Sequence, residues 1–139
     1  MHCPTLNMAR LYSQKHTVWM YSFSPSVISP VMQLPALFFG NEAPRLGTFH
    51  GADIGFVFGF PLLTSTLRAT DRRVQHFMQA AWGQFAHTGN PNGAEASGWE
   101  PFDAGHNNYL KIQDPSVMRD NFRDGACEPL FQLRYQDAP

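Results

Sequence analysis

The sequence predicts an α/β protein with one buried strand, several helices and a small hairpin. A short helical segment is followed by a β-branched and aromatic stretch, and a long helix with one apolar face comes later. The 139 residues are 43% hydrophobic and 14% aromatic, which is enough apolar material for a core. The 11 glycines and 11 prolines, set against 15% charged residues, indicate many turns between buried elements, as in a piece of a larger fold.

A helix is expected first, over residues 4–14, with Pro4 at its first position. Apolar residues that would pack on one side of it are Leu6, Met8, Leu11 and Tyr12. Thr17–Phe23 then has the β-branched and aromatic content of a buried strand. Residues 24–48 contain four prolines and are expected to form a long irregular loop.

Two further helices are expected after this loop. In Gly47–Gly59, a tight turn carrying His50 runs into a short helical segment. The clearest helix is expected to run from an N-cap at Thr70 or Asp71 to about His87. Its apolar residues follow helical spacing: Val74, Phe77, Met78, Ala81, Trp82 and Phe85. Gly89–Gly93, with the sequence GNPNG, ends it, because glycine can adopt a left-handed cap and proline blocks continuation.

The last third predicts a hairpin. Short strands are expected at Trp99–Phe102 and Tyr109–Ile112, joined by the polar turn DAGHNN. A helical stretch is expected near Val117–Arg123, before the terminal segment LFQLRY.

Several kinds of site are disfavoured by the sequence. The six histidines, His2, His16, His50, His76, His87 and His106, lack metal-ligand spacing, and no glycine-rich phosphate loop occurs, so neither a metal nor a cofactor is expected. The net charge of −1 disfavours nucleic acid as a partner. No apolar run is long enough to span a bilayer, and no signal peptide is seen in this chain.

The two cysteines, Cys3 and Cys127, are too far apart in sequence for a Cys-x-x-Cys redox or zinc site. The residues alone leave a structural pair open and favour two buried free thiols.

Serine-based catalysis would require Gly-x-Ser-x-Gly, and no serine of the chain lies in that context. His50 is flanked by the small residues Gly51 and Ala52, which leave its ring accessible. An imidazole in such a place can act as a general base, although a lone loop histidine is more often an ordinary polar residue.

Three blocks of the chain resemble the type-B carboxylesterases, the family that includes the cholinesterases and related fungal lipases. The first is CPTLNMARLYS with VWMYSFS, the second is GTFHGADIGFVFG, and the third is MQAAWGQFAHTGNPNG. They occur in the family's order and at about its spacing, and the likeness covers nearly the whole chain. Gly55 and Gly83 depart from it, since helical residues with side chains are more usual there.

The resemblance implies that residues 1–139 are a partial carboxylesterase domain, the C-terminal fragment of an α/β-hydrolase fold. His50 then takes the place of the catalytic histidine, the general base and acid. Cys3 and Cys127 fall where many members have a disulfide, which implies an oxidising compartment and a secreted or extracellular full-length parent. The substrate class implied is a small-molecule ester.

Because the α/β-hydrolase triad runs Ser, then Asp or Glu, then His, the serine, the acid and the oxyanion hole are expected before Met1. The isolated chain is therefore expected to be inactive as a serine esterase. Two alternatives are a non-catalytic cholinesterase-like binding module and a nonfunctional truncated remnant. The ester itself and the oligomeric state are left open.

Overall fold

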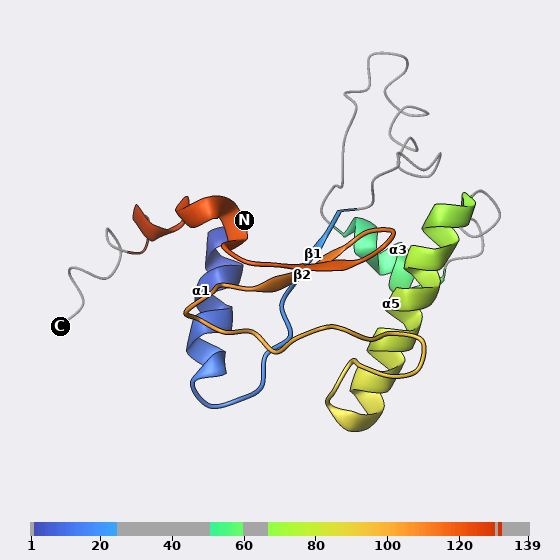
Figure 1. The fold of residues 1–139 in the computed structure, drawn as a ribbon, viewed down its shortest axis with the longest axis horizontal. Helices are drawn as coiled ribbons and strands as arrows, with labels where there is room; N and C mark the ends of the chain where they lie inside the picture. Colours follow the sequence, from blue (N-terminus) through green and yellow to red (C-terminus); the bar gives the residue numbers. More distant parts are fainter. Residues whose placement is uncertain (1, 25–50, 60–66, 130, 132–139) are drawn as a thin grey trace, which may run out of the picture. The chain divides into compact units, whose positions relative to one another are not determined.

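The structure, a computed structural model, describes residues 2–24, 51–59, 67–129 and 131. Its elements, in chain order, are α1 (His2–Ser13), β1 (Tyr21–Phe23), α3 (Ala52–Phe58), α5 (Ala69–Thr88), β2 (Tyr109–Ile112), β3 (Val117–Arg119) and the 3-10 helix η3 (Phe122–Gly125) (Figure 1).

The chain divides into two compact units, which are described separately. The first unit contains Met1–Tyr21, Glu100–Leu110 and Met118–Pro139, and the second contains Ser22–Trp99 and Lys111–Val117.

The strands form a sheet in the order β1-β2-β3. The Leu110 amide donates to the Met20 carbonyl at 2.9 Å, and the Ser24 amide donates to the Ile112 carbonyl, also at 2.9 Å. Residue numbers rise together along both strands between these bonds, which is the pattern of a parallel pair. Parallel neighbours need a crossover connection, and α3 and α5 lie within the connection from β1 to β2. The predicted α/β class is confirmed.

The predicted first strand is longer than the observed one. β1 covers Tyr21–Phe23 instead of Thr17–Phe23, and its three residues are half-buried. Met20, just before it, is the buried residue of this stretch, with 4% of its surface exposed. Among the described residues, β1 stands at the edge of the sheet and pairs with β2.

Of the two strands of the predicted hairpin, Tyr109–Ile112 is confirmed as β2, and the other is wrong. Trp99–Phe102 is not a strand, although the Phe102 amide donates to the Val18 carbonyl at 2.8 Å. The strand after β2 is β3, where the sequence predicted a helix over Val117–Arg123. Only Phe122–Gly125 at the end of that stretch turns helically, as the 3-10 helix η3. Pairing with β2 decides the structure of Val117–Arg119. The turn DAGHNN is closed by backbone and side-chain hydrogen bonds, among them the Asn107 amide to the Asp103 carbonyl and the Asp103 amide to the Asn108 side chain.

The core of the first unit lies between α1 and the C-terminal part of the chain. Its buried members are Leu6, Ala9, Met20, Phe102, Phe122 and Cys127. α1 therefore packs through Leu6 and Ala9, and it begins at His2, ahead of the predicted Pro4. The other predicted apolar residues of α1 are about half exposed: Met8 at 50%, Leu11 at 53% and Tyr12 at 54%. The helix was predicted correctly, and its buried face was not.

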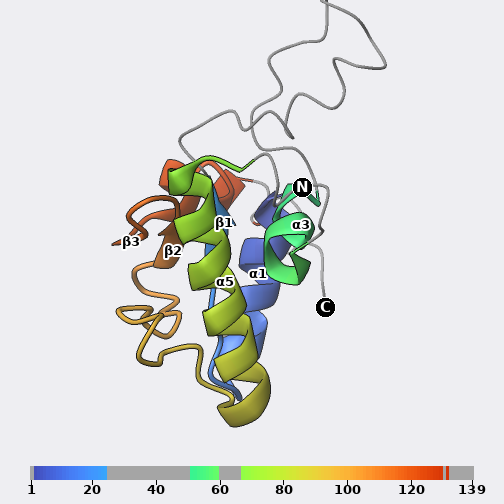
Figure 2. The same cartoon turned by 90° about the vertical axis from the view of Figure 1, so that its right-hand side faces the viewer.

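The core of the second unit is built on α5, which Figure 2 shows along its whole length. Val74, Met78 and Ala81 are buried on the predicted face, and α3 packs against this helix. Phe85 continues the apolar spacing but is 47% exposed, so the buried face ends before the helix does.

Both ends of α5 are capped by the chain itself. Ala69 is its first residue, and its N-cap is Arg68, two or three positions before the predicted cap. The Asp71 carboxylate accepts a hydrogen bond from the Arg68 amide at 3.3 Å. At the other end, Gly89 has the predicted left-handed conformation, with φ 76°, and its amide donates to the Phe85 carbonyl.

In the described part of the chain, every helix is too short or too polar to cross a bilayer.

Candidate active-site segment

The segment predicted to carry catalysis is described from Gly51 onward. His50 and the loop over residues 24–48, apart from Ser24, lie outside the described residues. Gly51 is the N-cap of α3, with φ 81° and ψ 2°, and its carbonyl accepts a hydrogen bond from the Ile54 amide at 3.2 Å. Among the described residues, the atom nearest to a Cβ at Gly51 would be Cδ1 of Ile54 at 3.6 Å, so the positive φ is what favours glycine there.

α3 is anchored at its middle and at its end. The Phe56 side chain is 3% exposed and meets the Phe23 ring edge-on, with 5.0 Å between ring centroids. Gly59 caps the helix in the left-handed region, where a Cβ atom would come within 2.6 Å of Nε2 of Gln79 on α5. The predicted short helix is thus confirmed, with Gly51 as its left-handed N-cap, and α3 is held close against α5. The part of the predicted turn before Gly51 lies outside the described residues.

The GNPNG stop after α5 is an ordered set of hydrogen bonds. The Thr88 hydroxyl donates to the Gln84 carbonyl at 2.8 Å, and it accepts from the Asn90 amide at 3.2 Å. The Asn90 side-chain oxygen in turn accepts from the Asn92 amide at 2.9 Å. The motif singled out in the sequence therefore acts here as a structural helix terminator.

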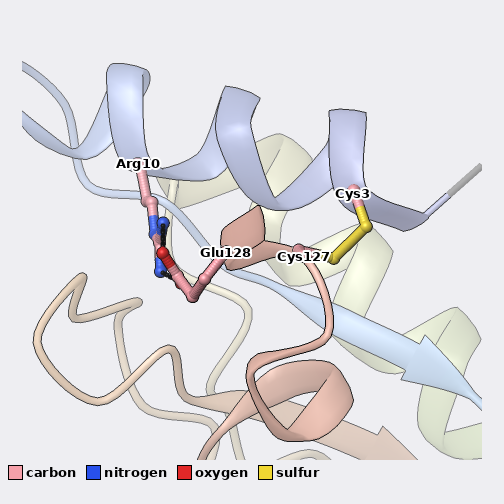
Figure 3. The surroundings of a disulfide bond; sticks show 4 residues. All are labelled: Cys3, Arg10, Cys127 and Glu128. Carbon is pink, nitrogen blue, oxygen red and sulfur yellow. Dashed lines mark hydrogen bonds and ion pairs between the residues drawn. A yellow bond between two sulfur atoms is a disulfide. The ribbon is translucent and has the colours of Figure 1, made fainter. Parts of the chain in front are cut away.

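Cys3 and Cys127 form a disulfide, with Cα atoms 5.3 Å apart and a sequence separation of 124 (Figure 3). The pairing implied by the family resemblance is confirmed, and the free-thiol interpretation is wrong. Two distant segments were brought together by packing, which residue type alone does not reveal. A loop of this length is worth about 4–5 kcal/mol on the chain-entropy estimate.

An ion pair that sequence reasoning missed lies beside the disulfide. Arg10 of α1 contacts the Glu128 carboxylate, with Nη1 donating to Oε2 at 3.3 Å and Nη2 donating to Oε1 (Figure 3). The hydrogen bonds from Arg10 hold the pKa of Glu128 below its usual value. The only sequence signal was an arginine seven positions after a cysteine and a glutamate directly after the other cysteine.

An Asp–His pair lies on the turn after Phe102. Nδ1 of His106 lies 2.8 Å from Oδ2 of Asp103, and the Gly105 amide donates to Oδ1 of Asp103 at 2.7 Å. The hydrogen bond from Gly105 and that from His106 lower the pKa of Asp103, while the bond to Asp103 raises the pKa of His106. Both side chains are more than half exposed, so this pair lacks the enclosed surroundings of an active site.

No group of three or more histidine, cysteine, aspartate or glutamate side chains among the described residues is arranged to hold a metal ion.

Solved structures define the class of fold. The chain matches a PNB esterase with a TM-score of 0.72 and 22% identity, covering 92% of this chain and 24% of that one. It also matches an esterase from anaerobic Clostridium hathewayi, described as able to hydrolyse aliphatic aromatic polyesters, with a TM-score of 0.69 and 21% identity over 90% of this chain and 23% of that one. These are α/β-hydrolases, and the chain has the fold of part of one.

The carboxylesterase family model matches residues 1–130, and the chain belongs to that family. It is 39% identical over 101 residues to bile salt-activated lipase of Bos taurus, covering 68% of this chain and 17% of the lipase. It is 28% identical over 130 residues to acetylcholinesterase of Bungarus fasciatus, covering 90% of this chain and 20% of that enzyme. The chain thus spans about a fifth of the length of these relatives.

Proposed function

We propose that this chain supplies the C-terminal part of a serine carboxylic-ester hydrolase, in which His50 is the general base and acid. The observation that carries the proposal is the family match over residues 1–130, which includes the GTFHGADIGFVFG segment around His50. In such a site, a neutral imidazole accepts the proton of the serine hydroxyl as the serine attacks the ester carbonyl. The imidazolium then returns this proton to the leaving alcohol.

The segment directly after His50 supports this role. Gly51 turns the chain in a left-handed conformation, and α3 is then fixed by the buried Phe56 ring. A rigid element directly after a loop residue limits where that residue can lie, which general-base catalysis requires. Asp53, in the first turn of α3, is the acidic residue that the family pattern places before the apolar-Phe-Gly stretch.

The nucleophile must come from other residues, because no serine of this chain lies in a Gly-x-Ser-x-Gly context. Under this proposal, these 139 residues alone have no esterase activity. The proposed substrate of the full-length parent is an ester. Its proposed location is oxidising, either secreted or extracellular, and the Cys3–Cys127 disulfide supports this location.

The test has two arms. The purified 139-residue chain is assayed with a simple aryl ester such as p-nitrophenyl acetate, and turnover should not exceed that of a His50→Gln variant. In the full-length protein, His50→Gln should lower kcat by at least about 10³-fold, as loss of a triad member does. His87→Gln is the matched control, because His87 lies exposed in the last turn of α5 and should leave kcat unchanged.

Two results would overturn the proposal. One is turnover by the isolated chain that disappears with His50→Gln. The other is a full-length enzyme in which His50→Gln and His87→Gln have equal, small effects on kcat.

A further inference from the structure

One face of α1 contacts the C-terminal segment of the first unit. Cys3, Leu6 and Arg10 are spaced by three and four positions, so they lie on the same side of the helix. Leu6 is 1% exposed and belongs to the same core cluster as Cys127. Figure 3 shows the side chains of Cys3 and Arg10 projecting from α1 toward two consecutive residues, Cys127 and Glu128.

Arg10 is held by several partners at once. Besides the two hydrogen bonds to Glu128, its Nε donates to Oδ1 of Asn107 at 3.0 Å. Its guanidinium carbon lies 5.2 Å from the centroid of the Phe131 ring. The Arg10 side chain is 24% exposed and that of Glu128 46%, so the arginine is the more enclosed partner of this pair. A planar fork with this many partners fixes Glu128 in one orientation relative to α1.

We propose that Arg10 and Glu128 hold Cys127 opposite Cys3 while both cysteines are still thiols, so that the ion pair positions the two sulfur atoms for oxidation. Arg10 is in this sense a positioning residue for the disulfide. In the unfolded chain, two thiols separated by 124 positions meet at the low effective concentration of a long loop. In the folded chain, the core cluster that contains Leu6 and Cys127 brings the two segments together, and the ion pair fixes the orientation of Cys127 relative to α1. The positioning role of Arg10 is independent of the esterase proposal.

The redox step is an exchange with a small disulfide, for which we take glutathione disulfide. The thiolate of one cysteine attacks it, releasing one glutathione thiolate and leaving a mixed disulfide on the protein. The second cysteine then attacks the protein sulfur of that mixed disulfide and releases the second glutathione. Two protein thiols are oxidised and one glutathione disulfide is reduced, so the equilibrium constant directly measures how well the fold holds the two sulfur atoms together.

The second unit provides a matched control. Arg73 of α5 also contacts a carboxylate with its fork: Nε lies 3.2 Å from Oδ1 and 3.0 Å from Oδ2 of Asp114. The two pairs have the same chemistry, and only Arg10–Glu128 lies next to the disulfide. Loss of an arginine–carboxylate pair as such can thus be separated from loss of positioning.

The experiment equilibrates the 139-residue chain with glutathione buffers, traps free thiols by alkylation and measures the oxidised fraction by mass spectrometry. Arg10→Gln and Glu128→Gln should each lower the equilibrium constant for disulfide formation by roughly three- to tenfold. Arg73→Gln and Asp114→Asn should change it less than about twofold, because residues that share no partner with the disulfide usually contribute independently of it.

Two further measurements separate positioning from loss of folding. In concentrated urea, all variants should share one equilibrium constant, lower than that of the folded wild type, because the ion pair exists only in the native chain. Arg10→Lys keeps the charge but loses the fork, and it should fall between wild type and Arg10→Gln. The proposal is overturned if Arg10→Gln and Arg73→Gln lower the constant equally, or if the wild-type constant is the same with and without urea.

Discussion

The Asn92 side chain forms hydrogen bonds with both the backbone amide and the backbone carbonyl of Trp99. Oδ1 of Asn92 accepts from the Trp99 amide at 2.9 Å, and Nδ2 donates to the Trp99 carbonyl at 2.8 Å. The amide group thereby replaces a neighbouring strand for one residue. These two bonds close the loop after α5. The Trp99 side chain is 6% exposed and packs against Trp82, with 5.8 Å between the ring centroids.

Replacing Asn92 by alanine is expected to lower the free energy of unfolding by about 1–3 kcal/mol, since two backbone groups lose their partners. Asn92→Asp keeps the acceptor but turns a carboxylate oxygen toward the Trp99 carbonyl, so it should destabilise the chain as well. Urea denaturation followed by tryptophan fluorescence measures both. Wild-type stability of the Asp variant would mean that the Nδ2 bond contributes nothing.

Two glycines of α5 and its C-terminal cap should respond oppositely to the same substitution. Gly83 lies inside the helix with no atom within 4 Å of a built Cβ, whereas Gly89 has φ 76°. Gly83→Ala should raise the free energy of unfolding by up to about 1 kcal/mol, because alanine favours the helix. Gly89→Ala should lower it by roughly 1–2 kcal/mol through left-handed strain. Thermal unfolding followed by circular dichroism tests the sign, and a stabilising Gly89→Ala would contradict the capping assignment.

A buried and an exposed phenylalanine of α3 form another matched pair. Phe56 is 3% exposed and packs against Phe23, whereas Phe58 is 71% exposed. Phe56→Ala should cost about 3–5 kcal/mol of unfolding free energy, as the loss of a buried ring does. Phe58→Ala should stay within about 0.5 kcal/mol of wild type. Equal effects in urea denaturation would show that α3 is not anchored through Phe56.

The Asp103–His106 pair predicts a pH dependence with a defined sign. The pKa of His106 is raised by its bond to Asp103, with Asp120 adding to the shift, so the pair stabilises the fold fully below the unfolded histidine pKa of about 6.5. That contribution is lost as pH rises through the raised pKa. The pKa of Asp103 is lowered, so its contribution is lost as pH falls through that lowered value.

NMR titration of the histidine ring protons tests this relationship. In wild type, His106 should titrate above about 6.5, and Asp103→Asn should move it downward. An unchanged His106 pKa in Asp103→Asn would refute the pairing.

Local signals predicted α1, α3, α5 and the strand β2 at Tyr109–Ile112, and they were wrong about the other strands around β2. α5 was predicted to within three residues at its start and one at its end, because periodic apolar residues and the GNPNG stop act within a turn or two. A helix was predicted at β3 and a strand at Trp99–Phe102, and both predictions are wrong, because Val117–Arg119 forms a strand only by pairing within the sheet. The catalytic role of His50 remains a prediction from the family resemblance.

The sequence by itself determined the α/β class, the left-handed glycine stop of α5, the turn into α3 and, through its three motif blocks, the family. Only the tertiary structure decided that α1 buries Leu6 and Ala9, that β1 and β2 are parallel, and that Arg10 meets Glu128 beside the disulfide. The division has a physical cause. Caps and turns depend on residues a few positions away, whereas burial, strand pairing and ion pairing depend on partners that only folding brings together from distant parts of the chain.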